Sequence, residues 1–484
     1  MKLGIISDIR YGSGASTTKT GLASGSASIL MHRAIRRFNK VHKPDAVVIF
    51  GDMLENYHVP DAIEQLEHLK AILAKLQCPH IVMPGKQDAA ASEFHKVFPH
   101  QETYWELKGV RLCPVSLDPT ELESDITRLK MARSAFKGAI AVLCTGEKVS
   151  QNLQDERGQR TATKILAAMR DNGIGICLAS HKQLHTGEPH FLSGLNLIPC
   201  PSLCTRPYPM KILDIDASGN CSVNSDELPM PASLRLYDWH VHSPFAYCSE
   251  NMDFAKNMAF AKEMGLAGFC QLEHSGQLYY DPHSYCDGHC HSAGLAGADP
   301  KHGRMEAFLK AANPFIGDNV RLGFEVDSDS AARPILDKKA QDKASVLAAS
   351  VHSFTPLSEQ AISDDSAADG FLGFNDKFLS HGFDFLAHPF RVYARLDKKP
   401  PQRIFRPLAK LLKKHKTAAE LNFHTDDPPS EFFQICLEEG VRLVLGSDSH
   451  NLCEIGELAP HLAMLRSIGF NGDLGDILLD FKLK

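Results

Sequence analysis

Two histidines near the middle of the chain have the spacing of a metal-binding pair. His240 and His242 stand two residues apart at the end of an apolar run, in the sequence Asp238-Trp-His-Val-His. Side chains two residues apart on a strand point to the same side, so both imidazoles can hold one cation. The pair is a weak signal alone, because a lone histidine at a strand end is most often capped or turned to solvent.

Similar donor groups recur along the rest of the chain. Six strand-end segments each offer His, Asp, Glu or Cys, and a buried polar cluster is costly unless something neutralises it. Neutral imidazole, thiolate and carboxylate together suit Zn, Mn or Fe better than Ca or Mg. The sequence therefore predicts a transition-metal site. Its candidate ligands are His240, His242, Cys248, His274, Glu325, His352, His388, Asp448 and His450.

Seven apolar runs in the second half each end in polar, ligand-type residues, and six of them carry all the candidate ligands except Cys248. The runs are LRLYDWHVH, GFCQLEH, RLGFEVDS, VLAASVHSF, DFLAHPF, AAELNFHT and VRLVLGSDSH. Amphipathic helices such as 252–264 and 403–414 are expected between several of them. Strands with functional groups at their C-terminal ends, joined by helices, predict a (β/α) barrel or a close relative, whose strand ends meet at one mouth.

From about Pro231 to its C-terminus the chain resembles the PHP (polymerase and histidinol phosphatase) family. The resemblance implies a distorted (β/α)7 barrel that binds up to three metal ions with nine side chains. Cys248 stands where the family more often has His, and Glu273 replaces a common Asp, which leaves its role open. The resemblance assigns His240, His242, Glu325 and Asp448 to the first metal, His352 and His388 with the shared Glu325 to the second, and His274 and His450 to the third, with Cys248 as the ninth ligand.

The resemblance also implies a metal-dependent phosphoesterase. A hydroxide bridging two cations would attack phosphorus in line, while the third metal and a protein cation neutralise the phosphate oxygens. Arg391, in AHPFR, is the candidate for that cation, and the alternative for it is a surface ion pair. Expected substrates are phosphorylated metabolites, nucleotides or short nucleic acids. Two other functions stay open: hydrolysis of a non-phosphate ester or amide, and a non-catalytic scaffold or phosphate-sensing regulator.

The first half of the chain alternates strand and helix signals, and its first helix is expected from about Ala27 to Lys40. Runs such as LGIISD, AVVIFGD and HIVMPG predict a mostly parallel sheet, and two later segments, 191–203 and 210–228, look like closing antiparallel strands. Residues 1–226 resemble the calcineurin-like metallophosphoesterases, which implies an αββα sandwich with a dinuclear site.

Several residues of that dinuclear site are replaced. Asp8 and Asp52 are present, but Arg10 stands where the first motif histidine is expected and Lys86 where a bridging Asn is expected. Residues 180–183, SHKQ, keep one imidazole of the last motif. Fixed positive charges beside the two carboxylates can form salt bridges with them in place of metal. We expect a retained fold without the dinuclear site; binding of a phosphate or nucleotide effector is the alternative.

Composition sets the remaining limits. The chain has 484 residues and a formal net charge of −6, so two domains are expected, with a Pro-punctuated boundary at 227–234 between 1–226 and 231–484. The near-neutral charge gives no support to bulk nucleic-acid wrapping. No apolar run approaches the roughly 18–20 residues of a membrane span, and the 13 scattered cysteines suit a reducing cytoplasm. A phosphorylated small molecule or nucleotide is the expected partner, with nucleic acid as an alternative.

Two local segments have alternative interpretations. CDGHCH, residues 286–291, is either a further zinc site or a lid over the mouth. The basic stretch 398–416 either attracts phosphorylated substrates or is a solvated helix face.

Overall fold

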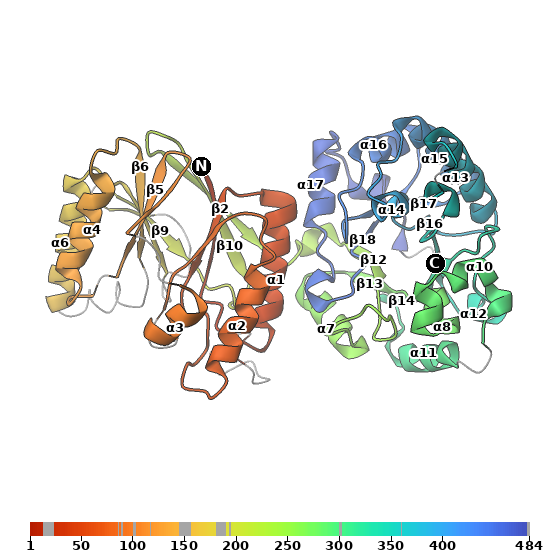
Figure 1. Ribbon diagram of the computed structural model, residues 1–484, viewed down its shortest axis with the longest axis horizontal. Helices are drawn as coiled ribbons and strands as arrows, with labels where there is room; N and C mark the ends of the chain where they lie inside the picture. The colour runs from red at the N-terminus through yellow and green to blue at the C-terminus, as the bar shows by residue number, and fades with distance from the viewer. Residues whose placement is uncertain are drawn as a thin grey trace. The chain divides into compact units, whose positions relative to one another are not determined.

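The computed structural model describes residues 1–484 except 13–23, 86, 89–90, 100–102, 117, 145–155, 181–189, 193–194, 300–302, 360 and 482–484. The expectations for Lys86 and for residues 181–183 therefore lie outside the described residues. The chain divides into two compact units, Met1–Pro229 and Met230–Lys484, here called the first and second unit. Each unit is described by itself (Figure 1).

The first unit contains two sheets. The five-stranded sheet has the order β11-β10-β1-β2-β3, and the six-stranded sheet has the order β4-β5-β6-β7-β9-β8. Strands β1 to β3 and strands β5, β6, β7 and β9 run parallel, while β10, β11, β4 and β8 pair antiparallel. The strands are β1 (Lys2–Ser7), β2 (Ala46–Phe50), β3 (His80–Val82), β4 (Trp105–Leu107), β5 (Val110–Val115), β6 (Ala139–Cys144), β7 (Ile176–Ser180), β8 (His190–Leu192), β9 (Leu195–Cys200), β10 (Pro209–Ile215) and β11 (Cys221–Glu227).

The two sheets of the first unit share one core. Leu3 and Phe50 of one sheet and Leu112 and Leu178 of the other belong to the same cluster of buried apolar side chains. A second cluster joins the six-stranded sheet to α4 and α6, and Figure 1 shows α1 and α2 beside the five-stranded sheet. The order of layers is thus helix, sheet, sheet, helix. The helices are α1 (Ala27–Arg37), α2 (Ala62–Leu73), α3 (Ala91–Val97), α4 (Leu122–Arg133) and α6 (Glu156–Asp171).

The second unit is built on a seven-stranded parallel sheet. Its strand order is β12-β13-β14-β15-β16-β17-β18, so neighbours in sequence are neighbours in space. Each strand falls on one of the seven apolar runs, which confirms the parallel barrel expected from them. The strands are β12 (Tyr237–Val241), β13 (Gly268–Gln271), β14 (Val320–Asp327), β15 (Val346–Ser350), β16 (Phe385–Leu386), β17 (Ala418–Asn422) and β18 (Leu443–Gly446).

The sheet closes almost completely into a barrel. Val241, at the end of β12, forms a parallel bridge with Ser449, just after β18. The amide of His242 donates to the Ser449 carbonyl at 3.1 Å. Near the other strand ends, Phe481 stacks on Tyr237 with ring centroids 4.2 Å apart. The first and last strands are therefore bridged directly after their carboxyl ends, and at the other end the C-terminal segment contacts both, through Phe481 on Tyr237 and Leu478 on Leu443.

Helices cover one face of the barrel strands. Phe324 and Leu421 pack against the helices, whereas Trp239 and Val444 belong to a separate cluster with Phe481. Because strand side chains alternate between faces, this second cluster fills the barrel interior. The helices are α7 (Phe254–Glu263), α8 (Ser275–Tyr279), α9 (Pro282–Cys286), α10 (His289–Ala293), α11 (Arg304–Ala312), α12 (Lys338–Gln341), α13 (Asp364–Leu379), α14 (Arg391–Ala394), α15 (Phe405–His415), α16 (Ser430–Glu439) and α17 (Ala459–Ser467).

Sequence and structure differ at a few element boundaries. The first helix was expected to reach Lys40 but ends at Arg37, where a π-helical turn over Phe38–His42 continues it. Strand β9, expected to be antiparallel, pairs parallel with β7 and antiparallel only with β8. Among the described residues, no helix is long and apolar enough to cross a membrane.

Candidate metal centre

Eight of the nine predicted ligands lie within or directly after barrel strands. His240 is inside β12 and Glu325 inside β14, and the other six follow β12, β13, β15, β16 and β18 by one to four residues. Parallel strands place their carboxyl ends at one edge, so these residues meet at one mouth. Cys248 lies six residues beyond His242, in the loop that leads to α7. The set that the strand ends bring together is His240, His242, His274, Glu325, His352, His388, Asp448 and His450.

Four fully buried side chains form the first cluster. The Nε2 atoms of His240 and His242 are 3.1 Å apart, and Asp448 Oδ1 lies 3.4 Å from the former and 3.0 Å from the latter. Glu325 Oε2 lies 3.5 Å from both Nε2 atoms. A tetrahedral ion with bonds of about 2.0–2.2 Å has ligand atoms separated by roughly 3.3–3.6 Å. The four donor atoms thus have the spacing of one tetrahedral coordination shell.

Glu325 joins this cluster to a second one. Its Oε2 atom faces His240 and His242, whereas its Oε1 atom lies 3.0 Å from His352 Nε2 and 2.7 Å from His388 Nε2. His274 Nδ1 lies 2.6 Å from Oε2. The carboxylate therefore presents one oxygen to each of two neighbouring groups of imidazoles. This is the geometry of a carboxylate that bridges two ions.

A third group lies on the other side of His242. The Nε2 atoms of His274 and His450 are 3.4 Å apart, and nitrogen atoms of both residues lie within 4.8 Å of a His242 nitrogen. Cys248 Sγ is 3.9 Å from His274 Nε2, and the Cys248 side chain is exposed at the mouth. The thiol thus stands beside His274, one of the two imidazoles that the resemblance assigns to the third metal.

Hydrogen bonds behind three imidazoles select the tautomer that can bind metal. His240 Nδ1 is 2.8 Å from Glu420 Oε1, and His352 Nδ1 is 2.7 Å from Asp327 Oδ1. His450 Nδ1 is 2.9 Å from the Asp448 carbonyl oxygen. Because each acceptor takes the Nδ1 proton, Nε2 is the nitrogen that remains for an ion, and it points into the clusters. All three imidazoles are thus arranged as metal ligands usually are.

The acidic groups of the centre are held ionised. Burial alone would raise the pKa of Glu325, but His274, His352 and His240 together lower it well below its usual value. Burial likewise opposes ionisation of Asp448, and Arg391 and His240 lower its pKa well below the usual range. Both carboxylates therefore carry negative charge inside the protein, where such charge needs a cation.

The imidazoles divide into two kinds. Burial lowers the pKa of His274 and His388, and burial together with His242 lowers that of His450 to about 2. These three are neutral near pH 7, the form that binds metal. For His242, burial lowers the pKa, but Asp448 and Glu273 raise it to about 9. In the metal-free protein a proton on His242 thus supplies part of the positive charge that an ion would bring.

Several buried polar atoms of the centre have no hydrogen-bond partner among the described residues. They include Glu325 Oε2, His242 Nδ1, His274 Nδ1 and His388 Nδ1. Glu325 Oε2 is notable, because three imidazole nitrogens lie within 3.5 Å of it and none donates to it with acceptable geometry. Buried polar atoms are rarely left unsatisfied. The donor set therefore fits metal ions, which would satisfy these lone pairs.

Local backbone geometry supports this convergence. His388 and Asp448 have positive φ angles of 27° and 54°, which cost energy in residues with a side chain. At Gly446, a Cβ atom would lie 1.9 Å from Glu420 Oε1 and 2.9 Å from His240 Cβ, so only glycine lets this carboxylate reach His240. The backbone is thus strained at His388 and Asp448, and this conformation brings the donor groups together.

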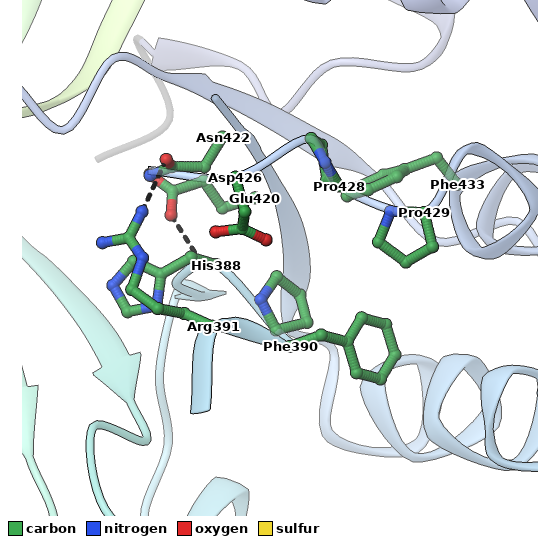
Figure 2. A pocket seen from close by; sticks show the side chains of 10 residues that line it. His388, Phe390, Arg391, Glu420, Asn422, Asp426, Pro428, Pro429 and Phe433 are labelled. Carbon is green, nitrogen blue, oxygen red and sulfur yellow. Dashed lines mark hydrogen bonds between the residues drawn. The ribbon is translucent and has the colours of Figure 1, made fainter. Parts of the chain in front are cut away.

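Arg391, the predicted phosphate-binding cation, is turned inward. Its side chain is 5% exposed; it donates through Nη1 to Asp448 Oδ2 and through Nη2 to Asn422 Oδ1, the latter at 2.8 Å. Figure 2 shows it beside His388 in a small pocket that includes Asn422 and Glu420. The alternative of a surface ion pair is wrong, because the pair is buried. Direct contact of Arg391 with phosphate stays a prediction. Its observed ion pair holds Asp448, a predicted metal ligand, in position.

Sequence reasoning assigned no role to several residues of the centre. Glu420 and Asp327 orient His240 and His352, and Glu420 Oε2 also accepts the backbone N–H of His388 at 2.7 Å. The role of Asp327 could have been predicted from the sequence, because it stands two residues after Glu325 and therefore lies on the same strand face. His424 Nδ1 lies 3.2 Å from Glu454 Oε1 beside His450, forming a further donor group that no motif indicated.

Glu273 and the CDGHCH segment have contacts outside the clusters. Glu273 accepts hydrogen bonds from the Ser243 hydroxyl and the His274 amide, and its Oε1 lies 3.6 Å from His242 Nδ1. Cys290 is buried with Tyr280 and Ile335, while Cys286 is exposed. The two thiols thus lie in different environments, and the grouped donors of the described residues do not include them.

The basic stretch 398–416 is largely paired with acids. Arg403 bonds Asp365 and Asp369 of α13, and Arg406 bonds Glu438 and Glu439 of α16. These ion pairs offset much of the positive charge. The observation favours the interpretation of this stretch as a solvated helix face.

The first unit contains a different carboxylate pair. Arg10 Nη2 lies 2.9 Å from Asp8 Oδ1 and 2.5 Å from Asp52 Oδ2, and all three side chains are at most 8% exposed. The backbones of these three residues have positive φ angles of 48° to 57°. The salt bridges expected between Arg10 and the two carboxylates are therefore present.

Comparisons with known proteins add little to this geometry. No family model matches the chain, and no curated protein matches it. Among solved structures, one described as a novel archaeal phosphodiesterase is 13% identical, covers 47% of this chain and 100% of its own, and has a TM-score of 0.24. A Thermotoga maritima protein solved by NMR is 14% identical, with coverages of 47% and 99% and a TM-score of 0.22. Likeness at this level assigns neither a fold nor an activity to the chain.

Proposed function

We propose that this protein is a metal-dependent phosphoesterase of the PHP type, which hydrolyses a phosphomonoester or phosphodiester at the mouth of the second unit. The observation that carries the proposal is the division of Glu325 between two groups of imidazoles. One buried carboxylate oxygen lies 3.5 Å from two imidazole nitrogens and the other lies 2.7–3.0 Å from two more. A carboxylate shared in this way would supply one oxygen to each of two cations.

Paired cations suit phosphoryl transfer. When bound, divalent ions supply Lewis acidity that makes water nucleophilic near neutral pH and neutralises charge on the phosphate. Imidazole with carboxylate favours Zn, Mn or Fe. The order of nine donors along the chain, which resembles that of the PHP family, supports a phosphate ester over a carbonyl substrate. Nucleotides, phosphorylated metabolites and short nucleic acids remain the candidate substrates.

The chain's own residues would bind the ions, orient the ligands and exclude water from the centre. His240, His242 and Asp448 would hold one ion with Glu325, and His352 and His388 would hold its neighbour. Glu420 and Asp327 fix the imidazole rings through Nδ1, as second partners of metal-binding histidines usually do. Arg391 holds Asp448 in place from behind. The surrounding barrel core is fully buried, which keeps the local dielectric low and the electrostatic interactions strong.

For the first unit we propose a calcineurin-like phosphoesterase fold without its own catalysis. The support is the Arg10 guanidinium, which lies between Asp8 and Asp52 and already neutralises them. Its proposed role is then either structural or the recognition of an effector such as a phosphate or nucleotide.

A paired set of variants tests the proposal. Removing one predicted ligand with His242→Gln should lower the bound metal and reduce hydrolysis in a panel of phosphorylated metabolites and short oligonucleotides by at least about 10³-fold, because charge stabilisation by the ions is lost. The control Asp52→Asn should leave turnover within about twofold, since it touches no predicted ligand. Metal content would be measured by elemental analysis of the purified full chain.

The opposite pattern would reverse the assignment. Loss of activity in Asp52→Asn with normal turnover in His242→Gln would place catalysis in the first unit. Turnover of carboxylic esters or amides but of no phosphate ester would show that the substrate class is wrong.

A further inference from the structure

Arg395 lies at the mouth of the barrel, one helical turn after Arg391. Its amide donates to the Arg391 carbonyl at 2.9 Å, so the two side chains leave the same side of α14. Unlike the buried Arg391, Arg395 is exposed, and its Nη1 donates to the backbone carbonyl of His352 at 3.3 Å. Its guanidinium is thus adjacent to the second group of imidazoles.

Arg395 differs from nearby arginines in its partners. Arg333 is bound by Asp329, Arg391 by Asp448, and Arg406 by Glu438 and Glu439. For Arg395, by contrast, no carboxylate lies within ion-pair distance in the described part of the chain, and a carbonyl is its one hydrogen-bond partner there. Most of its donor groups therefore face solvent at the mouth.

Hydrogen bonds show on which side of the mouth Arg395 lies. His352, whose carbonyl accepts from Arg395, has its Nδ1 atom 2.7 Å from Asp327 Oδ1. The Tyr285 hydroxyl donates to the same Asp327 oxygen at 3.3 Å. The Arg395 guanidinium therefore lies on the Asp327–His352 side of the mouth.

We propose that Arg395 is the residue that binds the phosphoryl oxygens of the substrate beside His352 and His388. The inference rests on the proposed function, because it takes the substrate to be a phosphate ester. A planar guanidinium can donate two parallel hydrogen bonds to phosphate, and an arginine without a carboxylate partner can do so without breaking an ion pair. The terminal nitrogens of Arg391 are already engaged by Asp448 and Asn422. Arg395 therefore takes the role that the sequence gave to Arg391.

Three variants of the metal-loaded full chain test this inference: Arg395→Ala, Arg395→Lys and the control Arg406→Ala. A charge-assisted hydrogen bond gained in the complex predicts that Arg395→Ala raises KM for the best phosphate ester about 10–100-fold. Inorganic phosphate should bind more weakly by a similar factor in calorimetry. Arg395→Lys should recover part of both losses, because it restores charge without the planar fork. Bound metal should not change in any variant.

The outcomes separate this inference from the proposed function. Unchanged KM and unchanged phosphate binding in Arg395→Ala would overturn the inference while leaving a phosphoesterase intact. Weakened phosphate binding in Arg395→Ala, in a protein that hydrolyses no phosphate ester, would support the anion site and overturn the proposed function. An equal loss in Arg406→Ala, or a loss of bound metal in Arg395→Ala, would also overturn the inference.

Discussion

Both units contain buried carboxylates at the ends of parallel strands, but they neutralise them differently. In the first unit a guanidinium of the same chain lies 2.5–2.9 Å from Asp8 and Asp52. In the second unit Glu325 is faced by imidazoles, and Asp448 by imidazoles and the Arg391 guanidinium. Three of these imidazoles have Nδ1 bonded to an oxygen and turn Nε2 inward. A guanidinium is always charged and fills the place of an ion, whereas an imidazole lone pair attracts one.

The comparison teaches that backbone geometry alone does not reveal a metal site. Asp8 and Asp52 have positive φ angles of 48° and 57°, and Asp448 has one of 54°. Strained carboxylates thus occur in both units. What separates the two is the chemical type of the neighbouring side chain, which the sequence already shows at Arg10.

The largest expected effect comes from the shared carboxylate of the second unit. Glu325→Gln keeps the shape of the side chain but removes its charge, so both ions lose a ligand. We expect loss of most bound metal and a fall in turnover of at least about 10³-fold. Elemental analysis and steady-state kinetics measure the two effects. A variant that keeps its full metal content would show that Glu325 is not a bridge.

Removing the cation of the first unit should act on stability instead. Arg10→Ala leaves Asp8 and Asp52 buried without their shared partner, which typically costs about 3–5 kcal/mol. Urea unfolding of the full chain, followed by a probe in the first unit, measures the change. The exposed ion pairs of Arg406 give a control, since Arg406→Ala should change the stability far less than Arg10→Ala does. Similar losses in both variants would contradict the buried ion pair as a stabilising feature.

A smaller effect is expected from the residues behind the ligands. Asp327→Asn retains the size of the side chain but weakens its hold on His352 Nδ1, and losses of this kind reduce metal affinity or activity about 10–100-fold. Metal titration of the chelated protein measures the affinity. The exposed pair Lys338 and Asp342 offers Asp342→Asn as a control with no expected change. An unaltered affinity in Asp327→Asn would show that His352 does not need this partner.

Much of the barrel could be predicted from the sequence because each strand is a short apolar run ending in a polar group. Seven such runs match β12 to β18, and the predicted ligands lie at their carboxyl ends. The expected helix at 252–264 forms over Phe254–Glu263, and that at 403–414 over Phe405–His415. Local patterns suffice here, since neighbouring strands in sequence are also neighbours in the barrel.

Other features depend on contacts between distant residues. Glu420 reaches His240 across 180 positions of sequence, and Arg391 reaches Asp448 across 57. No local pattern distinguishes Arg391, whose nitrogens turn inward, from Arg395, whose guanidinium stays exposed four residues later. In the first unit the apolar runs alone predicted a mostly parallel sheet and did not show how the strands divide between two sheets, which depends on distant pairings such as that of β1 with β10.

The bridge between Val241 and Ser449 has a consequence for when the donor groups of the first cluster can meet during synthesis. His240 and His242 leave the ribosome about two hundred residues before Asp448 does. A nascent chain that ends before β18 carries two imidazoles without the aspartate beside which they lie in the folded protein. The four-donor group is therefore complete only after β18 has been made and the barrel seam has closed.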